Sequence, residues 1–244
     1  MAWKAIALLA AVAASMSSNA DNAAAPSTGN GLAVPLHEAI YHATVRGIPV
    51  RVGLRLEQQG NRFFLYRSWV EPRGVFSFIR REFSETSLVR TGGDGAIIPI
   101  SYRKRDEVSD RNTDMRFDAT AGRVQVRYRE DETTSDWEPG IYDLLSLRLA
   151  LSHDLARDQL KEVYRVIDDR SRVEEVNVHI AGEETISTPL GELRTLRLEY
   201  NNRARDRMYR LWIAPDKDAA LVRLEQYEEG KLRGRLNIVS YRRL

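Results

Sequence analysis

The sequence predicts a mainly β fold, with one long antiparallel meander forming a strongly curved sheet or open barrel and one substantially buried helix at about residues 141–155. Three observations support this prediction. Apolar and charged residues alternate along many short segments. Turn signals rich in Gly and Pro separate these segments. One stretch alone carries apolar residues at helical spacing. A strand with one apolar and one charged face is typical of an antiparallel sheet wetted on one side.

The first twenty residues have the pattern of an export signal. Lys4 is their only charge, residues 5–14 are wholly apolar, and the small residues Ser18 and Ala20 precede a cleavage site after Ala20. We therefore expect a cleavable signal peptide over residues 1–20 and a periplasmic protein. The apolar run is about half the length that spans a bilayer, so no permanent membrane anchor is expected.

The rest of the chain divides into two parts. Residues 21–35 are rich in Ala, Ser, Asn and Gly and are predicted to be a disordered leader. Residues 36–244 show no linker and no internal repeat, which favours a single β-rich domain. Within it, residues 63–70 are apolar on both faces and predict a central strand. Further strands are predicted from the alternation in segments 124–129, 195–200, 222–225 and 232–238.

The predicted helix follows Pro139-Gly140. Leucines at helical spacing cover more than one of its faces, which predicts burial. Asp143 is placed in the first turn, where a carboxylate interacts favourably with the helix dipole. A buried helix within a long meander suggests a plug or lid over the sheet. The highly charged segment 103–114 is predicted to be a long loop.

Composition and motifs exclude several classes of function. The chain has no Cys, so it has no disulfide, Cys metal site or Cys nucleophile. Its 37 basic and 35 acidic residues nearly balance, so no nucleic-acid partner is expected. There is neither a nucleophile elbow nor a P-loop. The four His lack metal-ligand spacing, and neighbouring carboxylates in a strand point to opposite faces, so we predict no metal site, cofactor or catalytic residue.

Two groups of residues are candidates for ligand contact. In an extended segment, Arg203, Arg205 and Arg207 would line one face of a hairpin, where they could hold an anionic head group. The competing interpretation is a strand edge protected by charge. The aromatic candidates are Trp69, Trp137 and Trp212. Core packing is favoured for all three, although Trp137 could also line a cavity mouth.

The order of short motifs resembles that of a bacterial exported family, the domain of unknown function 3108. The resemblance runs from about Leu36 to Leu244. It rests on these segments: Glu71-Pro72-Arg73-Gly74, Phe76-Ser77-Phe78, Glu85 with Ser87, Ile98-Pro99-Ile100-Ser101-Tyr102, Phe117-Asp118, Tyr142-Asp143-Leu144-Leu145-Ser146, Thr188-Pro189-Leu190-Gly191-Glu192-Leu193, Leu211-Trp212-Ile213-Ala214-Pro215-Asp216 and Val222-Arg223-Leu224. The resemblance implies a periplasmic β-rich protein and no established reaction. It supplies no catalytic residues.

Three hypotheses for function follow. The first is a non-enzymatic periplasmic protein that binds an apolar or amphipathic envelope molecule, such as a lipid, in the concavity of its sheet. The second is a structural or assembly factor that binds another envelope protein through a sheet edge. The third is a hydrolase with a carboxylate-based site in a cleft. An outer-membrane barrel is disfavoured because the outward strand faces carry Arg and Glu.

Overall fold

The computed structural model describes residues 31–45, 48–74, 83–107, 109–202 and 207–244. Within these residues, fifteen strands form a single sheet. The strands are β1 (His37–Val45), β2 (Ile48–Gly60), β3 (Phe63–Pro72), β4 (Phe83–Thr91), β5 (Ile97–Asp106), β6 (Thr113–Asp118), β7 (Arg123–Tyr128), β8 (Asp131–Asp136), β9 (Ile141–Tyr142), β10 (Val163–Ile167), β11 (Val173–Thr188), β12 (Gly191–Asn202), β13 (Arg207–Ala214), β14 (Ala220–Glu228) and β15 (Lys231–Arg243).

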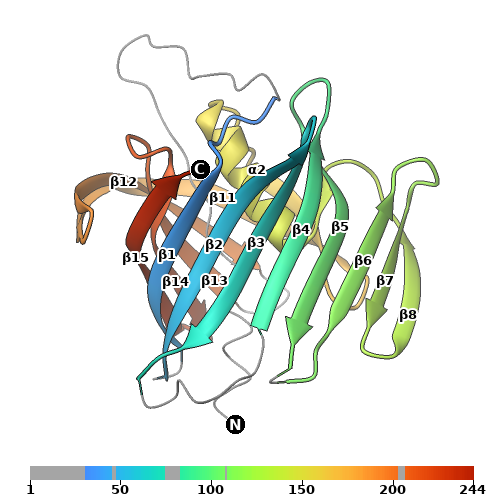
Figure 1. Ribbon diagram of the computed structural model, residues 1–244, viewed down its shortest axis with the longest axis horizontal. Coiled ribbons are helices and arrows are strands. Elements are labelled where there is room, and N and C mark those ends of the chain that lie inside the picture. Colours follow the sequence, from blue (N-terminus) through green and yellow to red (C-terminus); the bar gives the residue numbers. More distant parts are fainter. Residues whose placement is uncertain (1–30, 46–47, 75–82, 108, 203–206) are drawn as a thin grey trace.

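The sheet consists of two meanders joined through the first and last strands. Its order is β8-β7-β6-β5-β4-β3-β2-β1-β15-β14-β13-β12-β11-β10-β9. Every described pair of neighbours is antiparallel except β9 and β10, which are parallel. The sheet curves strongly, but β8 and β9 are not joined by a strand ladder, so the barrel is open (Figure 1). This architecture confirms the predicted fold class.

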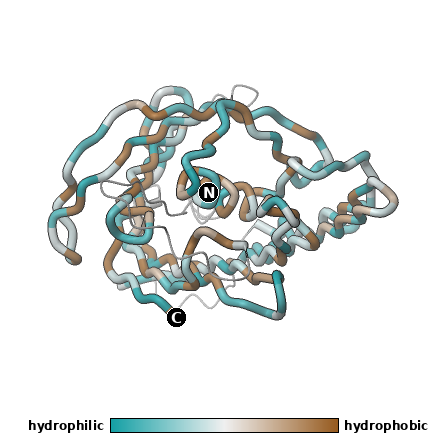
Figure 2. The backbone as a smooth tube through the Cα atoms, turned by 90° about the horizontal axis from the view of Figure 1, so that it is seen from above, coloured by the Kyte–Doolittle hydropathy of each residue, from teal (hydrophilic) through white to brown (hydrophobic). Residues whose placement is uncertain are grey.

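Burial alternates along several strands. In β4, burial alternates at every residue from Phe83 to Thr91, because successive side chains of a strand point to opposite faces. Figure 2 shows hydrophobic and hydrophilic residues mixed along the strands. The inner face provides most of the core, including Val52, Leu54 and Leu224, which are almost fully buried.

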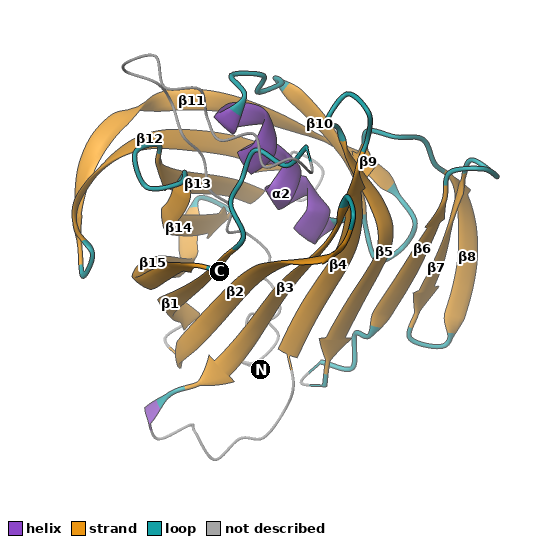
Figure 3. Ribbon diagram, turned by 45° about the horizontal axis from the view of Figure 1, so that its top comes forward, coloured by secondary structure: helices purple, strands orange, loops and turns teal. Residues whose placement is uncertain are grey.

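The helix α2 (Leu144–Ala156) lies in the concavity of the sheet (Figure 3). It packs against β3, β4 and β5 on one side and against β9 and β10 on the other. The predicted helix began too early, because Ile141 and Tyr142 form β9 and pair with β10. Asp143 is therefore the N-cap and not a residue of the first turn. This helix is not long and apolar enough to cross a membrane, and neither is any other helix in the described ranges.

The loop predicted over residues 103–114 is shorter than expected, because both of its ends belong to strands. Residues up to Asp106 belong to β5, and β6 begins at Thr113. Charged side chains lie on both faces of the end of β5: Arg103 is exposed, whereas Lys104 and Asp106 are buried. A strand with charges on both faces shows no apolar alternation, so the pattern that predicts strands was missing here.

The predicted signal peptide lies outside the described residues. Of the predicted leader, only residues 31–35 are described. Leu32 and Val34 are buried in the core. The backbone N–H of Ala33 donates a hydrogen bond to Nδ1 of His153 on α2, at 3.0 Å. The start of the described chain is thus attached to the helix.

Candidate functional site

A row of buried polar residues crosses the inner face of the sheet beneath α2. Ser68, Glu85, Lys104 and Thr113 lie directly opposite one another on β3, β4, β5 and β6. All four are buried, in a face that is otherwise largely apolar. Buried polar groups are costly unless they are paired. The contacts of these four residues therefore indicate the role of this polar cluster.

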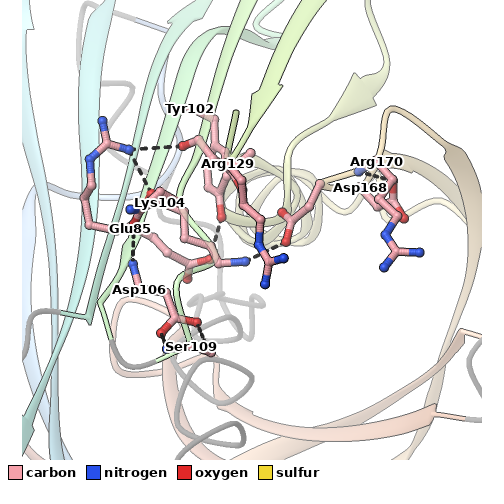
Figure 4. A network of polar contacts seen from close by, with 12 residues as sticks. Glu85, Tyr102, Lys104, Asp106, Ser109, Arg129, Asp168 and Arg170 are labelled. Atoms are coloured by element: carbon pink, nitrogen blue, oxygen red, sulfur yellow. Dashed lines mark hydrogen bonds and ion pairs between the residues drawn. The ribbon is translucent and has the colours of Figure 1, made fainter. Parts of the chain in front are cut away.

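Glu85 is held by α2 and β5. Arg148 of α2 lies with Nη1 3.6 Å from Oε2 of Glu85, and both side chains are almost fully buried. The hydroxyl of Tyr102 donates a hydrogen bond to the other carboxylate oxygen, Oε1, at 2.6 Å (Figure 4). Nearby, Nζ of Lys104 donates to Oδ2 of Asp169 at 2.6 Å. These contacts pair both buried cations with carboxylates.

Asp143 joins the start of α2 to the sheet. Its Oδ1 accepts hydrogen bonds from the backbone N–H groups of Leu145 and Ser146, at 2.9 and 2.8 Å. Its Oδ2 accepts from the hydroxyls of Ser87 and Ser146, at 2.8 and 2.7 Å. Burial raises the pKa of Asp143, although these hydrogen bonds act in the opposite direction. The side chain is thus a helix cap that also binds β4.

The chemistry of this cluster favours anchoring of the helix. Burial raises the pKa of Tyr102 well above its usual value, and the negative charges of Glu85 and Asp169 raise it further. The phenol therefore stays protonated and serves as a donor. Asp143 accepts four hydrogen bonds. Glu85 accepts a hydrogen bond at Oε1, and its Oε2 forms an ion pair with Arg148 without a hydrogen bond. These carboxylates are occupied in holding α2 on β4 and β5.

A second row lies on the inner face of the other half of the sheet. Val178, Tyr200, Tyr209, Gln226 and Gly234 are directly opposite one another on β11, β12, β13, β14 and β15. The rings of Tyr200 and Tyr209 are stacked, with centroids 4.5 Å apart. We call these five residues the β11–β15 row.

The charge of Arg148 on α2 affects residues on both halves of the sheet. Burial raises the pKa of Tyr200 well above its usual value, while the positive charges of Arg148 and Arg207 partly oppose this rise. Arg148 therefore pairs with Glu85 of β4, and its positive charge opposes the rise in the pKa of Tyr200 on β12.

The structure does not bring the three predicted Trp residues together. Trp69 is half-buried, and its Nε1 donates to Glu71, two residues along β3, at 3.2 Å. Trp137 is buried, with its ring 5.4 Å from that of Phe117 between centroids. Its Nε1 donates to the carbonyl oxygen of Ile141 at 2.8 Å. Trp137 therefore packs at the turn before α2.

Trp212 is also buried, but away from the polar cluster beneath α2. The guanidinium of Arg223 lies 5.5 Å from the centre of its ring. Trp212 alternates along β13 with Tyr209 and Leu211 of the inner face, and so belongs to the outer face. Core packing was the favoured prediction for Trp212, and its burial agrees with that prediction.

Of the predicted arginines, the structure describes only Arg207. Its Nη2 lies 3.1 Å from Oε1 of Glu228 on the neighbouring strand. It shares the inner face of β13 with Tyr209, two residues along the strand. Arg203 and Arg205 lie outside the described residues. Arg207 is thus close to the β11–β15 row, with its charge matched by a carboxylate.

Arg148, Lys104 and Gln226 were not among the residues predicted from the sequence. For Arg148 a signal was present, since it is the only Arg or Lys in a helix that is apolar on several faces. Such a residue requires a buried counter-charge. Lys104 gave no signal, because it stands between two other basic residues. Gln226 lies between a charged and an aromatic residue in the sequence. Only the register of β14 shows which face of the sheet its side chain points to.

A metal centre finds no support in the described part of the chain, where no three His, Asp or Glu side chains are placed to hold an ion.

The family model described as "Protein of unknown function (DUF3108)" matches residues 41–233. The chain belongs to this family. The resemblance in the motifs is thereby confirmed. Several motif residues, namely Glu85, Ser87, Tyr102, Asp143 and Ser146, meet in the cluster beneath α2.

Solved structures of similar shape include a β-barrel-like protein from Brucella abortus, of the domain of unknown function DUF1849. It has a TM-score of 0.54 at 12% identity, covering 86% of this chain and 98% of that chain. This similarity shows a shared fold. A protein with a YmcC-like fold from Bacteroides fragilis has a TM-score of 0.38 at 10% identity, covering 86% of this chain and 100% of that chain. Among curated proteins, the sequence has no significant match.

Proposed function

We propose that this DUF3108 protein is a non-enzymatic protein of the cell envelope that binds an apolar or amphipathic molecule on the concave face of its sheet. One observation carries the proposal. The closest packing of α2 is against β3–β5, β9 and β10, whereas β12–β15 extend the same inner face beyond it. That face carries Leu198, Leu211, Leu224 and Leu236 directly opposite one another, and all four are almost fully buried. An apolar inner wall in an open barrel suits an apolar ligand.

The location is proposed from the N-terminal sequence. The apolar run over residues 5–14 and the small residues before the predicted cleavage site have the composition of an export signal. The predicted periplasmic location and the predicted signal peptide belong together, since the signal is the route to that compartment. Mass analysis of protein recovered from the periplasm tests both, because cleavage after Ala20 leaves Asp21 as the first residue.

The two edge strands, β8 and β9, argue against the second hypothesis, a structural or assembly factor that binds another protein through a sheet edge. In β8, three of six residues are acidic, and its side chains meet the turn between β10 and β11. Oγ of Ser135 donates to the carbonyl oxygen of Ser171 at 3.2 Å, and the hydroxyls of Thr133 and Ser171 are in direct contact. The opposite edge, β9, is only two residues long. Charged and very short edge strands discourage strand addition.

A carboxylate-based hydrolase is the weaker alternative for a different reason. The buried carboxylates of Glu85 and Asp143 are engaged with α2, β4 and β5, as described above. A general acid or base must instead be within reach of a substrate. The geometry thus favours a binding protein over a hydrolase.

Native mass spectrometry of the full chain, exported and purified gently from the periplasm, tests the proposal. We expect a co-purifying amphiphile that is released on denaturation and recovered by lipid extraction. In Leu211→Gln, which changes the inner face of β13, the bound molecule should be lost. Met208→Gln changes the outer face of the same strand and should retain it. Unliganded protein in every preparation, with no binding of added lipid extract, would contradict the proposal.

A further inference from the structure

Gln226 is a fully buried amide with no hydrogen-bond partner. It lies in β14 and has no exposed surface. Neither Oε1 nor Nε2 has a partner. An unpaired buried polar group is destabilising, because it has lost its hydrogen bonds to water. Native proteins contain few such groups, and each calls for an explanation. A Gln at this position has both its donor and its acceptor available.

The register of the sheet shows which way Gln226 points. Residues directly opposite one another on neighbouring strands point to the same face. Tyr200 is buried, whereas its strand neighbour Glu199 is only half-buried, so Tyr200 points to the inner face, where most of the core lies. Tyr209 is opposite Tyr200, and Gln226 is opposite Tyr209. Gln226 therefore points to the inner face, as do the other members of the β11–β15 row.

The neighbours of Gln226 on the inner face are apolar, aromatic or without a side chain. Leu224, two residues before it, belongs to the row of leucines on the inner face. Gly234, its neighbour on β15, has no side chain. Tyr209, its neighbour on β13, stacks on Tyr200. The amide thus lies at the boundary between an apolar wall and an aromatic pair.

The cation on the same face of β13 is matched by a carboxylate, since Arg207 is 3.1 Å from Glu228. A ligand carboxylate or phosphate would therefore compete with Glu228 for Arg207. A neutral group that donates and accepts meets no such competition, and it matches a Gln amide, which has two donors and an acceptor.

We infer that Gln226 binds the polar group of the ligand, and that this ligand is a neutral amphiphile with an amide next to its acyl chain. The inference rests on the proposed function, whose binding face it uses. The ligand amide pairs with Oε1 and Nε2 of Gln226. Its chain lies along the leucines of β12–β15.

The test uses two twelve-carbon probes, dodecanamide and dodecanoate, with the purified full mature protein at pH 8, where the carboxylate is ionised. Affinities are measured by titration calorimetry in detergent-free buffer. We expect the amide to bind on the order of tenfold more tightly than the carboxylate, as one well-formed pair of hydrogen bonds provides. In Gln226→Leu this preference should disappear, with dodecanoate affinity little changed.

Thermal unfolding of the same variant separates a binding role from a structural one. If the amide is unpaired in the free protein, Gln226→Leu should raise the midpoint of unfolding, because it removes an unsatisfied buried group. The matched control is Gln125→Leu, an exposed position on β7, which should change neither the preference nor the midpoint.

The outcomes distinguish this inference from the function on which it rests. Equal binding of both probes, or a preference that survives in Gln226→Leu, overturns the role of Gln226 and leaves the lipid-binding function standing. A lower midpoint in Gln226→Leu shows that the amide is a structural partner and also overturns the inference. If the wild-type protein binds neither probe nor any lipid from an envelope extract, both proposals fail.

Discussion

Arg148 on α2 and Glu85 on β4 form an ion pair that is removed from water, with side-chain exposures of 2% and 1% and a separation of 3.6 Å. Taking two charges out of water is costly, and their attraction offsets that cost only while both are present. The pair therefore fixes the position of α2 on the sheet more than it adds to net stability.

Removing one partner of this pair should be far more damaging than removing both. We expect Arg148→Met to lower the free energy of unfolding by roughly 3–5 kcal/mol, because Glu85 is left as a buried charge. The double variant Arg148→Met with Glu85→Gln should recover much of this loss. Urea unfolding followed by circular dichroism measures both.

The control for that experiment is a solvent-exposed ion pair. Arg165 and Glu138 are 2.8 Å apart, with side-chain exposures of 40% and 63%. Arg165→Met should cost about 1 kcal/mol or less, as for other exposed pairs. If the effects of Arg148→Met and Glu85→Gln simply add, the two side chains do not act as a pair.

Acid should loosen the contact between α2 and the start of the described chain. Nδ1 of His153 accepts a hydrogen bond from Ala33, and protonation would remove this acceptor. Burial lowers the pKa of His153 to about 4, and the positive charge of Arg157 acts in the same direction. The folded protein thus prefers the neutral ring. The stability this provides is complete above pH 6.5, the unfolded value, and is lost as the pH falls toward about 4.

The matching measurement is the free energy of unfolding from pH 7.5 to pH 4. Over that range His153 should account for a loss of about 3 kcal/mol, by the relation between pKa and free energy. In His153→Gln the free energy of unfolding should depend less on pH, because the titrating ring is gone. Some dependence should remain, because His37, whose pKa is also lowered by burial, is present in both proteins. The exposed His179→Gln is the control. Identical profiles for wild type and His153→Gln would show that this ring does not titrate with folding.

Trp69 requires a glycine beside it. It is opposite Gly53 on β2, and a Cβ at Gly53 would lie 2.1 Å from the indole ring. Gly53→Ala should lower the free energy of unfolding by about 1–3 kcal/mol, the usual cost of overpacking. The loss should largely vanish when Trp69 is also replaced by Val.

Another glycine of the same strand provides the control. At Gly60, an added Cβ would meet nothing within 4 Å, so Gly60→Ala should have little effect on thermal unfolding. Equal losses at Gly53 and Gly60 would point to backbone conformation as the cause and not to contact with Trp69.

The two ends of the sheet can be joined covalently. The hydroxyls of Thr133 on β8 and Ser171 in the turn before β11 are in direct contact. Because the chain has no Cys, a Thr133→Cys, Ser171→Cys double variant has only one possible disulfide. We expect it to form under mild oxidation and to raise the midpoint of thermal unfolding by several degrees.

Non-reducing electrophoresis and intact mass measure this disulfide. Each single Cys variant serves as a control, since neither can form the intramolecular bond. Failure of the double variant to cross-link in the folded protein would show that the seam between β8 and the turn is open in solution.

Several local features followed from the sequence because their causes are local. Alternation placed the strands, and a run of leucines placed the helix, since both patterns reflect burial of one or more faces. Asp118 accepts hydrogen bonds from the backbone N–H groups of Thr120 and Ala121, a contact between near neighbours in the chain. The boundary at Asp143 was missed because a two-residue strand has too few residues to show a period.

The candidate site depended on relationships that no local pattern contains. Glu85 and Arg148 are 63 residues apart in the chain and meet only because α2 folds back under β4 and β5. The direction of Gln226 depends on the register of β12–β15, and a shift of one residue would turn it outward. The sequence by itself determined a β meander with one apolar helix, since alternation and helical spacing arise from neighbouring residues. Only the tertiary structure decided which charges are paired and which amide is left unpaired, because pairing requires side chains from distant segments to meet in space.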